Sequence, residues 1–158
     1  MNTFKKSKVK FTFRVVGIAL NNNRVLLHKA EKDDFWALPG GHIEMQEQAE
    51  NALKREMKEE IGVEIEVKRM VWVVENFFDY EDIPYHELGL YFLIALPSDS
   101  KLYDKNEPFI RYDERTKLIF QWHRLDELEK TRLYPTFLQK GLKSIPKNIV
   151  HIVQIDHK

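Results

Sequence analysis

Three glutamates near the middle of the chain have the residue type and the spacing to bind a cation. Residues 48–61 are almost all good helix formers, and Gly62 follows where a helix usually ends. On such a helix Glu56 lies one turn from both Glu59 and Glu60, so the three carboxylates share one patch. Like charges placed this way destabilise a helix by about 0.2–0.5 kcal/mol per pair. A hard divalent cation such as Mg²⁺, which takes oxygen ligands, would relieve that repulsion.

The carboxylate patch borders the apolar side of the same predicted helix. Four apolar residues recur there at helical spacing: Ala49, Leu53, Met57 and Ile61. A solvated surface is the alternative interpretation of a helix rich in glutamate and lysine. The position beside a core favours a cation site, because burial strengthens the repulsion between like charges. Arg55 supplies a counter-charge, since it lies one turn from Glu59 and can reach back to Glu47.

The residues before the helix extend this pattern into a longer motif. Pro39, Gly40 and Gly41 predict a tight turn, with the glycines supplying backbone angles that other residues avoid. From Gly41 to Val63, the run containing Glu47 and Arg55-Glu56-Met57-Lys58-Glu59-Glu60-Ile61-Gly62-Val63 resembles the Nudix box at every specified position. The order of predicted strands around it also resembles a Nudix domain, of the MutT-like kind, over most of the chain.

The resemblance implies an enzyme and a reaction. Nudix enzymes hydrolyse a nucleoside diphosphate linked to another group X, typically giving a nucleoside monophosphate and phosphorylated X. The same residues suit that chemistry, because attack of water on an anionic pyrophosphate needs a cation, a base and a frame that holds both. The expected cofactor is Mg²⁺, with Mn²⁺ as a substitute, and the expected partner is a small nucleotide.

Site roles carry over from the motif residue by residue. The resemblance implies metal ligation by Glu56, Glu59 and Glu60, with the carbonyl of Gly40 as a backbone ligand. Either Glu56 or Glu59 could act as the base toward water. Arg55 and Glu47 would orient the loop and the helix as an ion pair, and Gly41 and Gly62 would have structural roles. Two positions depart from the commoner family pattern: Gln46 replaces a glycine, and Gln48 replaces a small hydroxyl residue that often caps the helix.

Candidates outside the box rest on weaker signals. Some Nudix enzymes add a glutamate from a later loop, for which Glu114 is the candidate and Glu107 and Glu87 are the alternatives. An isolated glutamate in a late loop is usually solvated. Candidate substrate contacts are Trp36, Lys29 and Tyr80, whose alternative interpretations are a core aromatic, a surface lysine and a loop aromatic.

Composition places the chain among soluble globular proteins. Its 158 residues suit one domain, expected over 1–158 with a loose segment at 1–8, and its formal net charge is zero. Neutral charge does not indicate binding to DNA. The absence of cysteine excludes disulfides and a cysteine nucleophile. No apolar run is long enough to cross a membrane, so we expect a cytoplasmic protein. A homodimer is a candidate assembly, because dimers are common in the family.

Periodicity predicts a mixed α/β protein. Alternating or continuous apolar residues predict strands at 9–20, 24–29, 63–68, 70–78, 86–96, 118–123 and 149–155. A turn is expected at 21–23, with loops at 30–38, 79–85 and 98–108. The resemblance to Nudix domains implies a short helix at 125–128. Another helix is expected to begin at Tyr134-Pro135 and to end before Pro146. The resemblance implies that these elements form the Nudix α/β/α sandwich, a mixed sheet between helices.

Two other functions are compatible with the sequence. A nucleotide-sensing module without catalysis would use the same fold, but such domains tend to lose the carboxylates that this chain keeps. Pyrophosphohydrolysis at an RNA 5′ end is a variant of the main hypothesis, and it would favour a basic channel that the neutral net charge does not suggest. A third class, the isomerase branch of the fold, uses a cysteine that the chain lacks.

Overall fold

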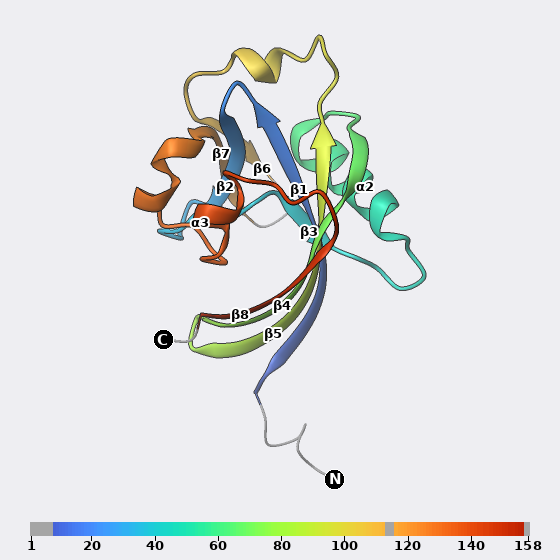
Figure 1. Ribbon diagram of the computed structural model, residues 1–158, viewed down its shortest axis with the longest axis vertical. Coiled ribbons are helices and arrows are strands. Elements are labelled where there is room, and N and C mark those ends of the chain that lie inside the picture. The colour runs from blue at the N-terminus through green and yellow to red at the C-terminus, as the bar shows by residue number, and fades with distance from the viewer. Residues whose placement is uncertain (1–7, 113–115, 157–158) are drawn as a thin grey trace.

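A mixed β-sheet forms the centre of the molecule. The computed structural model describes residues 8–112 and 116–156 (Figure 1). Within them an eight-stranded sheet has the order β6-β7-β2-β1-β5-β4-β8, and the short β3 pairs with β1 beside β2. The pairs β1–β5 and β4–β8 are parallel and the others are antiparallel. The strands are β1 Lys10–Asn21, β2 Arg24–Ala30, β3 Gly40–His42, β4 Glu66–Tyr80, β5 Ile83–Ala95, β6 Phe109–Tyr112, β7 Lys117–Arg124 and β8 Val150–Asp156.

Helical segments cover both faces of the sheet. Helix α2 (Ala49–Ile61) packs on one face, which we call the α2 face, through Leu53 and Met57. The 3₁₀ segment η2 (Leu125–Lys130) and the short helix α3 (Leu138–Gly141) cover the other, the α3 face. Figure 1 shows α2 and α3 on opposite sides of the strands. A further 3₁₀ turn, η1, spans Lys101–Asp104. The predicted α/β/α sandwich is confirmed.

Helix α2 follows its sequence pattern closely. Leu53, Met57 and Ile61 are buried against the sheet, as their spacing predicts. The helix ends at Gly62, whose backbone is left-handed at φ 69° and whose N–H donates to the carbonyl of Lys58. It begins at Ala49, one residue later than predicted, because Gln48 is extended.

The β4–β5 region differs from its prediction. The two strands expected at 63–68 and 70–78 are one strand, β4, which keeps pairing through two register shifts. The expected loop at 79–85 is a two-residue turn at Glu81 and Asp82, both with positive φ. That backbone suits a tight hairpin. Charged residues at the tip made the loop look longer than it is.

Three other differences are smaller. Strands β3 and β6 are not predicted, because a three-residue and a four-residue strand give no measurable alternation. The helix expected from Tyr134-Pro135 is only one turn long, at Leu138–Gly141. Of the predicted loose segment 1–8, only Lys8 lies within the described residues. No helix in the described ranges is long and apolar enough to cross a membrane.

Candidate active site

Two glycines bring β3 against its neighbours. Gly40 and Gly41 pair with Val16 and Val15 of β1. A side chain at Gly40 would overlap the carbonyl of Val15, and one at Gly41 would overlap the carboxylate of Glu56. The turn predicted at these glycines is wrong, because they are strand residues and only Gly62 has positive φ among the described glycines. Glycine is needed at positions 40 and 41 because a larger residue would overlap the neighbouring atoms.

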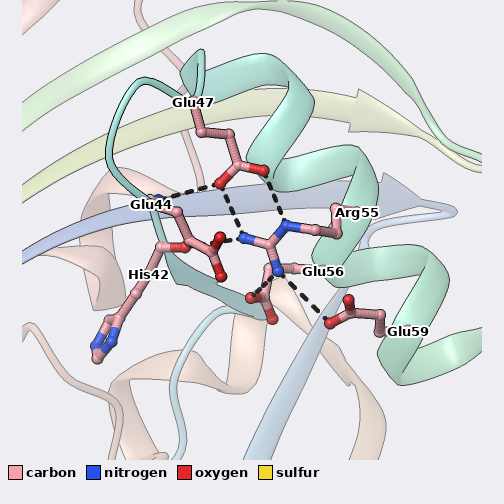
Figure 2. A network of polar contacts seen from close by, with 6 residues as sticks. All are labelled: His42, Glu44, Glu47, Arg55, Glu56 and Glu59. Carbon is pink, nitrogen blue, oxygen red and sulfur yellow. Dashed lines mark hydrogen bonds and ion pairs between the residues drawn. The ribbon is translucent and has the colours of Figure 1, made fainter.

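Arg55 is the centre of the polar network beside these glycines (Figure 2). Its Nε and Nη2 donate to the two carboxylate oxygens of Glu47 at 2.8 and 3.0 Å. Nη2 also donates to the carbonyl of His42 in β3 at 3.2 Å. Nη1 donates to Glu56 at 2.8 Å and lies 3.5 Å from a carboxylate oxygen of Glu59. One guanidinium therefore joins the loop before α2, the helix itself and β3.

The Glu47–Arg55 pair of this network is charged at neutral pH. The hydrogen bonds from Arg55 lower the pKa of Glu47 to about 2, helped by the backbone N–H of Glu44. The same contact with Glu47 raises the pKa of Arg55 above its ordinary value, with Glu56 adding to the effect. Fork-shaped pairs of this kind fix orientation as well as adding energy. The Glu47–Arg55 pair therefore keeps its charged hydrogen bonds in the neutral range.

The loop between β3 and α2 is closed by Glu47 instead of a helix cap. Glu47 accepts a hydrogen bond from the N–H of Glu44 at 3.1 Å. Gln48 makes no capping hydrogen bond through its side chain. Gln46 has φ 63°, in the left-handed region that favours glycine, which is the residue commonly found there in the family pattern. This position carries backbone strain that glycine would avoid.

The residues of the network suit a divalent cation chemically. The side chain of Glu56 is 17% exposed and that of Glu59 is 60% exposed, while Glu60 lies half-buried on the same helix. The carboxylates outnumber the single guanidinium, so the surplus charge is negative. Their oxygens are the hard donors that Mg²⁺ takes. In this conformation Glu56 and Glu59 contact Arg55. No three acidic or histidine side chains within the described residues converge to hold an ion.

The candidates outside the box are scattered. Glu114 lies outside the described residues. Glu107 is exposed before β6. Glu87 lies in β5, buried in the sheet, where Thr12 donates a hydrogen bond to it. It is therefore not a loop residue.

The aromatic candidates lie around the loop after β2. Lys29 Nζ lies 5.1 Å from the ring centroid of Trp36, which also packs edge-on to His123. Trp36 is half-buried against the core of the α3 face. The hydroxyl of Tyr80 donates to the Asp33 carboxylate at 3.1 Å, which ties the loop to the β4–β5 hairpin. Sequence reasoning missed the contact between Arg55 and the His42 carbonyl, because backbone acceptors leave no mark in a sequence.

Residues 11–142 match the NUDIX domain family model. The chain belongs to the Nudix family, and it is a hydrolase that acts on pyrophosphate bonds. Proteins of this family generally use a divalent metal.

Individual relatives carry different substrate names. The chain is 34% identical to nucleoside triphosphatase NudI of an Enterobacter species over 81% of its own length and 95% of that protein's. It is 28% identical to an 8-oxo-dGTP diphosphatase of Buchnera aphidicola, over 77% and 83% of the two chains. The crystal structure of a NUDIX hydrolase from Nitrosomonas europaea superposes with a TM-score of 0.64 at 19% identity, covering 94% of this chain and 80% of the other, and supports the fold.

Substitution of Gly41 should reduce activity, whereas substitution of Gly40 should reduce stability. Gly41→Ala pushes the flexible Glu56 side chain aside, so we expect near-normal melting and at least about 10-fold slower pyrophosphate hydrolysis. Gly40→Ala meets backbone, so we expect a loss of about 1–3 kcal/mol of stability. Thermal melts and turnover measure both. Full turnover in Gly41→Ala would show that the placement of Glu56 against Gly41 is unimportant.

Relieving the strain at Gln46 should stabilise the protein. Gln46→Gly removes a left-handed non-glycine residue, so we expect the melting temperature to rise by about 2 °C. The matched control is Gln48→Gly, where φ is −73° and glycine only adds freedom to the unfolded chain. A melting temperature that falls equally in both variants would contradict strain at Gln46.

Proposed function

We propose that the protein catalyses Mg²⁺-dependent hydrolysis of a nucleoside diphosphate linked to a moiety X, giving a nucleoside monophosphate and phosphorylated X. One observation carries the proposal: the Arg55 network holds Glu56 against Gly41 while Glu59 and Glu60 lie on the same helix. The family supplies the reaction class, and the surplus of carboxylates fits a divalent cation.

Each group of the site has a part in this proposal. Glu56, Glu59 and Glu60, with the carbonyl of Gly40, would hold Mg²⁺, or Mn²⁺ in its place. When bound, the cation would neutralise the charge of the pyrophosphate and polarise its P–O bonds. Glu56 or Glu59 would take the proton of the attacking water.

The hydrolysis replaces one P–O bond with another. The water oxygen bonds to phosphorus as the bridging P–O bond breaks, and the leaving phosphate keeps the electron pair. Arg55 positions Glu56 and Glu59 in the structure, and Glu47 holds Arg55. This arrangement can supply the preorganised charge that lowers the barrier.

A substrate panel tests the reaction. We expect turnover of at least one class among NTPs, dNTPs, nucleotide sugars, ADP-ribose, dinucleoside polyphosphates and 5′-triphosphate RNA, supported by Mg²⁺ or Mn²⁺ and abolished by EDTA. Turnover of the RNA alone would favour 5′-end processing. Nucleotide binding without turnover of any substrate would favour the sensing module.

Charge removal on α2 tests the metal ligands. Glu59→Gln and Glu60→Gln should each lower turnover by about 10²-fold or more with the fold intact, because a metal-charge contribution is worth several kcal/mol. Glu50→Gln is the matched control, since Glu50 is exposed in the first turn of the same helix. Full activity in both Glu59→Gln and Glu60→Gln would contradict the assignment.

A further inference from the structure

A row of polar side chains crosses the α3 face of the sheet. Thr12 of β1 pairs with Glu87 of β5, Glu87 pairs with Asn76 of β4, and Asn76 pairs with Gln154 of β8. Side chains of directly opposed residues point to the same face. Asn76 follows Val74 by two residues, and Val74 lies in the core of the α3 face, which places the row on that face. We call these four residues the polar row.

The two ends of the polar row are well satisfied. Gln154 Oε1 accepts the backbone N–H of Phe137 at 2.9 Å, and its amide nitrogen donates to Asp156 at 3.1 Å. Thr12 Oγ1 donates to Glu87 Oε1 at 3.0 Å. These contacts account for the outer residues as parts of the fold.

The two central residues of the polar row, Asn76 and Glu87, are buried, and their acceptor oxygens are not all used in hydrogen bonds. Asn76 is 5% exposed, and its Oδ1 has no hydrogen-bond partner within the described residues. Glu87 is 9% exposed, and the same residues offer it one hydrogen bond, from Thr12, and no ion-pair partner within 4 Å. A buried acceptor without a partner costs free energy, and native proteins keep few of them. Together they point to a ligand that donates hydrogen bonds.

The Thr12 end of the polar row is close to the candidate active site along β1. Val15 of β1 pairs with Gly41, on which the Glu56 carboxylate rests. Thr12 lies three residues earlier on the same strand, which is about 10 Å at the usual rise. Strand β3 also contributes to both faces, since Gly41 contacts Glu56 on the α2 face while His42 pairs with Arg14 on the other. A nucleotide with its pyrophosphate at Glu56 could place its base at the row.

We propose that Glu87 and Asn76 read the base of the nucleotide substrate and select guanine. This rests on the proposed function. A carboxylate only accepts hydrogen bonds, and guanine presents a continuous run of donors, N1–H and N2–H₂, on one edge. Adenine, cytosine and uracil interrupt that edge with acceptors, which would face the carboxylate unfavourably. Oxidation at C8 leaves this edge unchanged, so the pair does not separate guanine from 8-oxoguanine.

Binding of monophosphates to the protein in EDTA tests the inference without catalysis. NMR titration should show GMP binding about 10-fold more tightly than AMP and than IMP, which lacks the N2 amino group. In Glu87→Gln the differences should shrink to within about 3-fold. The matched control is Glu75→Gln on β4, because Glu75 lies on the opposite face and pairs with exposed His151.

Several outcomes would overturn the inference. Equal binding of GMP, IMP and AMP would do so, as would no detectable binding, or a guanine preference that survives in Glu87→Gln. Equal binding of GMP and AMP with weaker binding of their 2′-deoxy forms would place a ribose hydroxyl at the carboxylate instead. If Glu87→Gln does not fold, the wild-type comparison of GMP with IMP still decides.

The binding test and the substrate panel test base selection and hydrolysis independently. Selective GMP binding without turnover of any substrate would contradict the hydrolysis and leave base selection standing. Turnover that does not distinguish guanine from adenine substrates, with equal monophosphate binding, would contradict base selection alone.

Discussion

The geometry of the candidate site depends on one guanidinium. Arg55 reaches Glu47 in the loop, the His42 carbonyl in β3, and Glu56 and Glu59 on its own helix. These contacts join the loop and the strand to the helix that carries Arg55, so the three elements hold one relative position. The side chain is 29% exposed, and partial burial makes its charged hydrogen bonds worth more than those of a surface pair.

The two faces of the sheet carry different groups of polar side chains. The α2 face carries the carboxylates, held by apolar packing of Leu53 and Met57 and by the space at Gly41. The α3 face carries the polar row, in which Asn76 Oδ1 has no hydrogen-bond partner within the described residues and the Glu87 carboxylate has one, from Thr12. Strand β1 joins the two, because its residues alternate between the faces. A substrate that spans both sides would be held at its pyrophosphate by one and at its base by the other.

Local spacing predicted the parts of the molecule that depend on short-range geometry. The 3.6-residue period placed α2 and its buried side, and positions 47 and 55 suggested the ion pair that the structure contains. The Gly40-Gly41 strand could not be predicted this way, because its cause is close contact with Val15 and Glu56 across the fold. The pairing of Glu87 with Asn76 follows from the two-residue turn at Glu81 and Asp82, which the loop expected at 79–85 did not anticipate. Glu87 was a candidate only as a late-loop ligand.

The central claim, that the carboxylates of α2 bind the catalytic cation, is tested most directly by a crystal structure with Mn²⁺ and a non-hydrolysable nucleotide, using anomalous scattering to locate the ion. We expect the main peak among Glu56, Glu59 and Glu60 near the Gly40 carbonyl, with Glu59 turned away from Arg55. A peak elsewhere, or none while Glu56 and Glu59 keep their contacts with Arg55, would contradict the claim.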